Sequence, residues 1–161
     1  MPSDLLAVSF LGTPFMEPWT VRHLLSNPPE IVSLPRKIPD GPLWEVPESE
    51  LDRDSAAWRF WDSLDALPGV GPTRVGKLMA RKRRHLIPIV DDVVATFLLV
   101  PESEWWSVVR SYVLDQRRRG YIEALRPGDV SASVPTLRLL DAAIWMRYSP
   151  PALPYRKELG N

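Results

Sequence analysis

The segment 67–72, which reads Leu-Pro-Gly-Val-Gly-Pro, constrains the fold of this chain more than any other. Pro68 ends a preceding helix, because proline lacks an N–H group and restricts the residue before it. Gly69 and Gly71 allow positive φ angles and let another molecule approach the backbone closely. Pro72 suits the first turn of a new helix. We therefore predict a short glycine-rich hairpin between two helices.

Apolar residues on both sides of this hairpin recur at helical spacing. Before it they are Trp58, Trp61, Leu64 and Leu67, and after it they are Val75, Leu78 and Met79. This spacing predicts one helix from Ser55 to Ala66 and a second helix that begins near Pro72. The whole unit spans residues 55–85. We expect Trp58 and Trp61 to lie in the core.

Strand-like alternation of polar and apolar residues is nearly absent, so we predict a single all-α domain over residues 1–161. Further helices are expected at 5–11, from Pro18 to Asn27, after Asp91, from Ser103 to Gly120, and from Pro135 to Pro150. The arginine triplet 117–119 suits the C-terminus of its helix electrostatically. The proline-rich segment Ile31–Pro47 is expected to be a loop anchored by Leu43 and Trp44, and residues 152–161 a frayed tail.

The charge and the composition exclude several classes of function. Twenty basic residues balance 20 acidic ones, so affinity for nucleic acid must come from local patches. The chain has no cysteine, which excludes disulfides, thiolate zinc sites and iron–sulfur clusters. With His23 and His85 as its only histidines, we expect no metal site built from side chains. We see no apolar run that could span a bilayer and no basic leader, so we expect a cytoplasmic protein with no membrane partner.

Backbone N–H groups of the hairpin and of the following first helical turn have no intrahelical acceptor, and such a cluster favours an anion such as phosphate. A basic stripe continues from this point along one side of the second helix, at Arg74, Lys77, Arg81 and Arg84. Phosphate contacts of this kind set the position of the protein on the nucleic acid and do not read its base sequence. A purely structural turn with a solvated basic face is the alternative.

The hairpin resembles the helix-hairpin-helix motif of DNA-repair and DNA-processing proteins, in which the hairpin reads Leu-Pro-Gly-Val-Gly. The resemblance implies that hairpin amides hold one backbone phosphate of double-stranded DNA, with a monovalent cation on the hairpin carbonyls as a possible cofactor. The residues that it assigns to DNA binding are Gly69, Val70, Gly71, Thr73, Arg74, Lys77 and Arg81.

A pair of carboxylates follows the short apolar connection Leu86–Val90. Asp91 and Asp92 precede a helical face that begins at Val93, and on local grounds Asp91 is a helix N-cap. In base-excision DNA glycosylases built on this motif, a similar connection leads to Val-Asp-Thr-His-Val, whose aspartate is the catalytic carboxylate. Asp91 lies at the family's separation from Thr73, so the resemblance implies that Asp91 is catalytic.

Such an enzyme needs a fixed anion beside the sugar C1′, because an oxocarbenium-like cation develops there as the base leaves. The base must first leave the stack and enter a pocket, often against aromatic rings. The candidates for these rings are Trp44, Trp58, Trp61, Trp105 and Trp106.

The chain also departs from the glycosylase pattern. Bifunctional members carry lysine where this chain has Thr73, so Schiff-base and lyase chemistry is not expected. Asp92 and Val93 replace the family's Thr-His, and no base-intercalating loop is recognisable. The overall pattern of the chain, including the segment Arg138–Arg147, looks closer to a family of uncharacterised bacterial proteins. Three hypotheses remain open: a monofunctional glycosylase-like hydrolase of DNA repair, a non-catalytic DNA-binding module, or a related fold that serves a nucleoside, another small molecule or a protein.

Overall fold

A computed structural model describes residues 18–26 and 28–150, and these residues form helices, turns and loops with no strand. The prediction of a helical fold is confirmed for this part of the chain. The expected helix at 5–11 and the expected tail at 152–161 lie outside the described residues.

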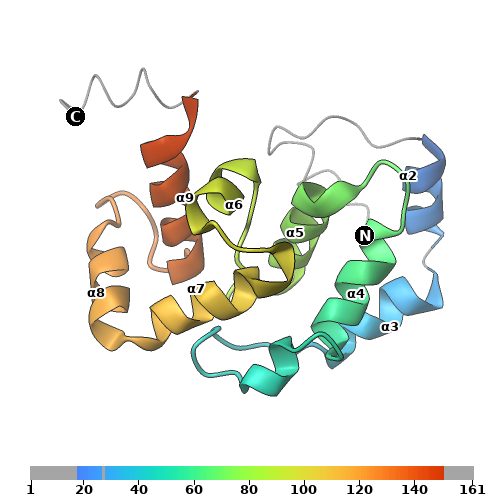
Figure 1. The fold of residues 1–161 in the computed structure, drawn as a ribbon, viewed down its shortest axis with the longest axis horizontal. Coiled ribbons are helices and arrows are strands. Elements are labelled where there is room, and N and C mark those ends of the chain that lie inside the picture. Colours follow the sequence, from blue (N-terminus) through green and yellow to red (C-terminus); the bar gives the residue numbers. More distant parts are fainter. Residues whose placement is uncertain (1–17, 27, 151–161) are drawn as a thin grey trace.

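The described helices form two groups that lie side by side (Figure 1). They are α2 (Pro18–Leu25), α3 (Pro29–Lys37), the short 3-10 helix η1 (Glu48–Leu51), α4 (Ala56–Asp65), α5 (Gly71–Lys82), α6 (Asp92–Leu98), the 3-10 helix η2 (Glu102–Glu104), α7 (Trp105–Leu114), α8 (Gln116–Ala124) and α9 (Thr136–Tyr148). In the first group, α3 packs on α4 and α4 packs on α5. In the second group, α6 packs on α9, and α8 packs on both α7 and α9.

Four tryptophans join the two groups. Trp58 and Trp61 of α4 meet Trp105 and Trp106 of α7, and the Trp58 and Trp106 ring centroids are 4.4 Å apart. Trp61 contacts the edges of both α7 rings, at 5.7 and 6.3 Å between centroids. The exposed fractions of Trp58 and Trp61 are both 2%, which confirms the predicted core positions. Large aromatic rings therefore supply the central packing between short helices.

The prediction of a loop over Ile31–Pro47 is wrong in its first part, because α3 extends to Lys37 despite Pro35 within it. Ile31, Pro35 and Ile38 are buried at helical spacing, and this apolar face packs on α4. Arg83 donates to the carbonyls of Pro35 and Ile38. Tertiary contacts thus stabilise a helix that proline disfavours. After α3 the chain does run as a connection, with Leu43 buried and Trp44 partly buried as expected.

The prediction that the arginine triplet 117–119 ends a long helix is wrong. The triplet lies in the first turns of a separate helix, α8. Asp115 breaks the chain with ψ 118° and caps α8 by accepting from the N–H groups of Arg117 and Arg118. Arg119 turns back and donates to the carbonyls of Val113 and Leu114, which end α7. One arginine therefore still serves a helix C-terminus, although across a break in the helix.

Two glycines provide a matched test of the backbone geometry, because an added Cβ would meet no atom within 4 Å at either position. Gly120 lies within α8, and Gly71 has a left-handed φ of 68°. We predict that Gly120→Ala raises the free energy of unfolding by about 0.5–1 kcal/mol, because alanine is the better helix former. Gly71→Ala should lower it by about 1 kcal/mol, because alanine is strained at positive φ. Urea denaturation measures both changes, and a stabilising Gly71→Ala would contradict the left-handed turn.

Candidate functional site

The turn between α4 and α5 has the predicted geometry. Helix α4 ends at Asp65, α5 begins at Gly71, and the φ angles of Gly69 and Gly71 are 77° and 68°. Pro68 and Gly69 are exposed, whereas Val70 is buried with an exposed fraction of 1%. The valine therefore anchors the turn in the core, and the glycine-rich tip faces outward.

Each carbonyl of this turn, from residue 67 to residue 70, accepts a hydrogen bond from the chain itself. The N–H of Val70 donates to the carbonyl of Leu67 at 3.1 Å. Buried Thr20 of α2 donates its hydroxyl to the carbonyl of Pro68 at 2.6 Å. The Nη1 atom of Arg74 donates to the carbonyl of Gly69 and, at 3.2 Å, to that of Val70. The acceptors of the turn are thus engaged internally.

The hydrogen-bond donors at the start of α5, unlike the carbonyls of the turn, have no acceptor within their helix. The N-cap residue of this helix, Val70, makes no side-chain cap hydrogen bond, and proline occupies one of the first two helical positions. The N–H groups of Gly71 and Thr73 belong to this first turn, where a helix offers no intrahelical acceptor. Pro72 beside them is exposed. Because the macrodipole also places partial positive charge at a helix N-terminus, this end of α5 favours an anion.

The predicted basic stripe is divided by the fold. Helix α5 ends at Lys82, before Arg84, which instead donates to the carbonyl of Ser133. Arg74 folds back over the turn, as described above. Lys77 is half-buried and lines a cavity, whereas Arg81 is exposed. The stripe therefore does not continue beyond α5 as one solvated face.

Asp91 caps α6, as the local sequence predicts. Its Oδ1 atom accepts from the N–H groups of Val93 and Val94, at 3.1 and 3.0 Å. The connection that leads to it is buried at Leu86, Ile87, Pro88 and Val90, and partly buried at Ile89. A rigid apolar segment thus fixes the position of the carboxylate.

Asp91 also lines a cavity of about 370 Å³ between α5, the start of α6, and α9. The other polar or aromatic residues of this lining are Lys77, Arg138, Asp141 and Trp145. Lys77 follows Gly71 by six residues, so the hairpin and the cavity are separated by about 9 Å along α5. This distance is shorter than three base steps of DNA, at about 3.4 Å for each step. The structure therefore brings two predicted site residues, Asp91 and Lys77, to one cavity near the hairpin.

The pair Arg138 and Asp141 holds the connection that precedes Asp91. Arg138 Nη1 lies 3.1 Å from Asp141 Oδ2, and Arg138 Nη2 donates to the carbonyl of Ile87. Asp141 Oδ2 also accepts from the N–H of Ile89, at 3.3 Å. Helix α9 therefore binds this segment at the carbonyl of Ile87 and the N–H of Ile89. These contacts position Asp91, which follows Ile89 by two residues.

This pair was not predicted from the sequence, although one signal for it was present. Asp141 lies four residues after Leu137 and three before Ile144, so it occupies the inward-facing stripe of α9. A charged residue on such a stripe is rarely buried without a partner. Arg138, one turn before it, is that partner.

Burial dominates the electrostatics of the cavity. Burial, with a smaller contribution from nearby Asp91, raises the pKa of Asp141 to about 7, although Arg138 and the Ile89 N–H act in the opposite direction. Burial also lowers the pKa of Lys77, and the carboxylates of Asp91 and Asp92 partly offset this effect. The cavity therefore brings basic and acidic groups together beside Asp141, a carboxyl that is removed from solvent.

None of the five predicted tryptophan candidates lines this cavity. Trp58, Trp61, Trp105 and Trp106 belong to the interhelical cluster, and the ring of Trp44 lies under the guanidinium of Arg119 at 5.0 Å. Trp145 of α9 is only partly buried and supplies the aromatic surface instead.

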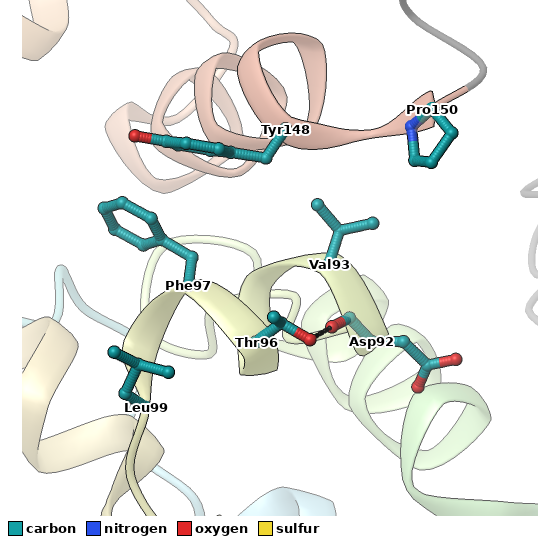
Figure 2. A pocket seen from close by; sticks show the side chains of 7 residues that line it. All are labelled: Asp92, Val93, Thr96, Phe97, Leu99, Tyr148 and Pro150. Atoms are coloured by element: carbon teal, nitrogen blue, oxygen red, sulfur yellow. Dashed lines mark hydrogen bonds between the residues drawn. The ribbon is translucent and has the colours of Figure 1, made fainter.

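A second hollow of about 650 Å³ lies between α6 and the end of α9 (Figure 2). The rings of Phe97 and Tyr148 lie against each other on one side of it, with centroids 5.0 Å apart. Thr96 donates to the carbonyl of Asp92, and Leu99 lies at the rim with a left-handed φ of 56°. This lining is mostly apolar, with one charged residue, so it offers less chemistry than the Asp91 cavity.

Residues 18–26 and 28–150 contain neither a cluster of metal-binding side chains nor a membrane-spanning helix. No group of three or more histidine, aspartate or glutamate residues could hold a metal ion in this range. The helices of the same range are each too short or too polar to cross a bilayer.

These features define a helical protein with an outward-facing glycine-rich turn beside a charged cavity. The chain belongs to DUF6308, a family of unknown function, which it matches over residues 1–148. No curated protein and no solved structure shows significant similarity to it.

The raised pKa of Asp141 predicts a pH dependence of stability. The ordinary pKa of aspartate is 3.8, so between this value and about 7 the folded state binds more protons at Asp141 than the unfolded state. The contribution of this group to stability should therefore fall as the pH rises through that window. Chemical denaturation of the wild type and of Asp141→Asn at pH 5 and pH 8 tests this. The free energy of unfolding of Asp141→Asn, taken relative to that of the wild type, should be higher at pH 8 than at pH 5. An equal difference at the two pH values would refute the raised pKa of Asp141.

Proposed function

We propose that this chain is a DNA-binding protein of the helix-hairpin-helix type, whose turn between α4 and α5 holds one backbone phosphate of duplex DNA. One observation carries the proposal: the tip of the turn is exposed, its carbonyls are engaged internally, and the N-cap residue of α5, Val70, makes no side-chain cap hydrogen bond. Such a surface presents donors to a ligand that offers only acceptors. A phosphate of a nucleic-acid backbone is such a ligand.

The zero net charge agrees with a small, local contact. Affinity would come from the α5 N-terminus and from exposed Arg81, not from a field over the whole surface. Each neutralised phosphate contributes about −0.9 to the slope of log K against log salt, so a footprint of two to four phosphates gives a slope of about −2 to −4.

We further propose that Asp91 is the catalytic carboxylate of a monofunctional DNA N-glycosylase. It lines a cavity of about 370 Å³, which lies within the usual range of roughly 300–1,000 Å³ for ligand pockets. The hydrogen bonds that cap α6 use only its Oδ1 atom, so Oδ2 remains for a ligand. Beside C1′ this anion would stabilise the cation that forms as the base leaves, before water adds there. The residue at the family's lysine position is Thr73, so no Schiff base is proposed.

A second candidate is a non-catalytic DNA-binding module in which Asp91 serves only as a helix cap. The two hydrogen bonds to its Oδ1 atom favour this candidate. Because asparagine caps helices as well as aspartate does, substitution can separate the capping role from the charge.

The hairpin proposal predicts the effect of Gly71→Val on DNA binding. Valine disfavours the φ of 68° at this position, so the turn should change shape and its amides should no longer converge on a phosphate. We expect binding to a fluorescent duplex, measured by anisotropy, to weaken about tenfold or more, equivalent to about 1.4 kcal/mol. The matched control is Gly128→Val, in an open loop where an added Cβ meets no atom within 4 Å. Equal binding by both variants would argue against the hairpin as the anchor.

The catalytic proposal predicts a selective effect of Asp91→Asn. Single-turnover release of free base would be measured on duplexes that carry deaminated, alkylated or oxidised bases. The variant should keep its melting temperature and its DNA affinity but lose about 10²-fold or more in rate, because a charge aimed at the transition state is removed. Asp92→Asn is the control, since it makes the same charge change at an adjacent, exposed residue. If the wild type binds these duplexes but releases no base from any of them, the catalytic proposal fails and the non-catalytic candidate is favoured.

A further inference from the structure

Arg74 makes an unusual contact with the turn that precedes its own helix. One nitrogen, Nη1, donates to two successive carbonyls, those of Gly69 and Val70. Two carbonyls that accept from a single atom must point toward one place, which is also how carbonyl groups surround a bound cation. The left-handed φ angles at Gly69 and Gly71 accompany this arrangement.

The carbonyls of the turn do not fit a bound monovalent cation in this chain. The carbonyl of Leu67 accepts from the N–H of Val70, and that of Pro68 accepts from the hydroxyl of Thr20. The carbonyls of Gly69 and Val70 accept from Arg74. An ion placed against the last two would also meet the guanidinium, and two like charges a few ångströms apart repel each other. The guanidinium keeps its charge at every pH at which the protein is folded.

We propose that the guanidinium of Arg74 takes the place of the hairpin cation, so that the turn keeps its shape and binds phosphate without a metal ion. The DNA part of this inference rests on the proposed function. Arg74 thereby becomes a positioning residue, which aligns the N–H groups of Gly71 and Thr73 through the turn. Removal of its side chain should expose the two carbonyls and create a site for K⁺ or Na⁺.

The first test needs no DNA. Melting temperatures of the wild type and of Arg74→Ala are compared in potassium, sodium and tetramethylammonium chloride at one ionic strength. The wild type should melt at one temperature in all three salts. Arg74→Ala should melt lower, and K⁺ or Na⁺ at tenfold its Kd should raise its melting temperature by about 3 °C relative to tetramethylammonium. Arg81→Ala, which loses a charge from the same helix, should show no such preference.

Two results would overturn the inference: a wild-type melting temperature that depends on K⁺ or Na⁺, or an Arg74→Ala protein that is indifferent to both ions. If Arg74→Ala does not fold, Arg74→Met retains most of the aliphatic side chain without the donors and takes its place. The wild-type comparison needs no substitution, so a dependence of its melting temperature on K⁺ or Na⁺ overturns the inference even without a folded variant.

The second test repeats the three salts with a fluorescent duplex. Wild-type affinity should be equal in all three at one ionic strength, and that of Arg74→Ala should be several-fold higher with K⁺ or Na⁺ than with tetramethylammonium. A wild type that binds duplex only with a metal ion would overturn the inference and leave the proposed function standing. A wild type that binds no duplex in any salt, with the expected melting behaviour, would overturn the proposed function and leave the role of Arg74 standing.

Discussion

The packing of α4 against α7 through four tryptophans is the interaction on which the rest of the structure depends. Trp58 and Trp106 approach within 4.4 Å between ring centroids, and Trp61 meets both rings of α7. Their indole N–H groups are also used: Trp58 donates to the carbonyl of Leu51 and Trp61 to Glu102. Because the Asp91 cavity lies between α5 of one group of helices and α6 and α9 of the other, this packing sets its width.

Helix α5 connects the hairpin to the cavity, and its own packing explains how. An added Cβ at Gly76 would lie 3.7 Å from the Trp61 ring and 3.8 Å from the carbonyl of Val90. These are ordinary van der Waals distances, so α5 lies close to both the tryptophan cluster and the segment that ends at Asp91. The turn at the start of α5, the carboxylate, and the Arg138–Asp141 pair are in this way parts of one rigid arrangement.

Local sequence was sufficient to predict the hairpin, the α5 N-terminus and the Asp91 cap, because glycine, proline and aspartate act on the backbone within a few residues. It was insufficient for α3 and for the break at Asp115, where tertiary contacts override local preference. The partners of Asp91 in the cavity come from α9, about fifty residues later, and no local pattern relates the two. Asp141 was the exception that could have been found, as a carboxylate on an apolar stripe. The fold of Arg74 onto the turn depends on side-chain geometry that the sequence pattern does not specify.

The central claim is that the first-turn amides of α5 hold a backbone phosphate. The most direct measurement is a titration of the ¹⁵N-labelled protein with a short duplex, followed through backbone amide chemical shifts. The claim predicts that the N–H signals of Gly71 and Thr73 move most, downfield as for amides that gain a charged acceptor, with smaller changes near Arg81. Largest shifts at a distant surface, such as α8, or no shift at saturating duplex, would contradict it.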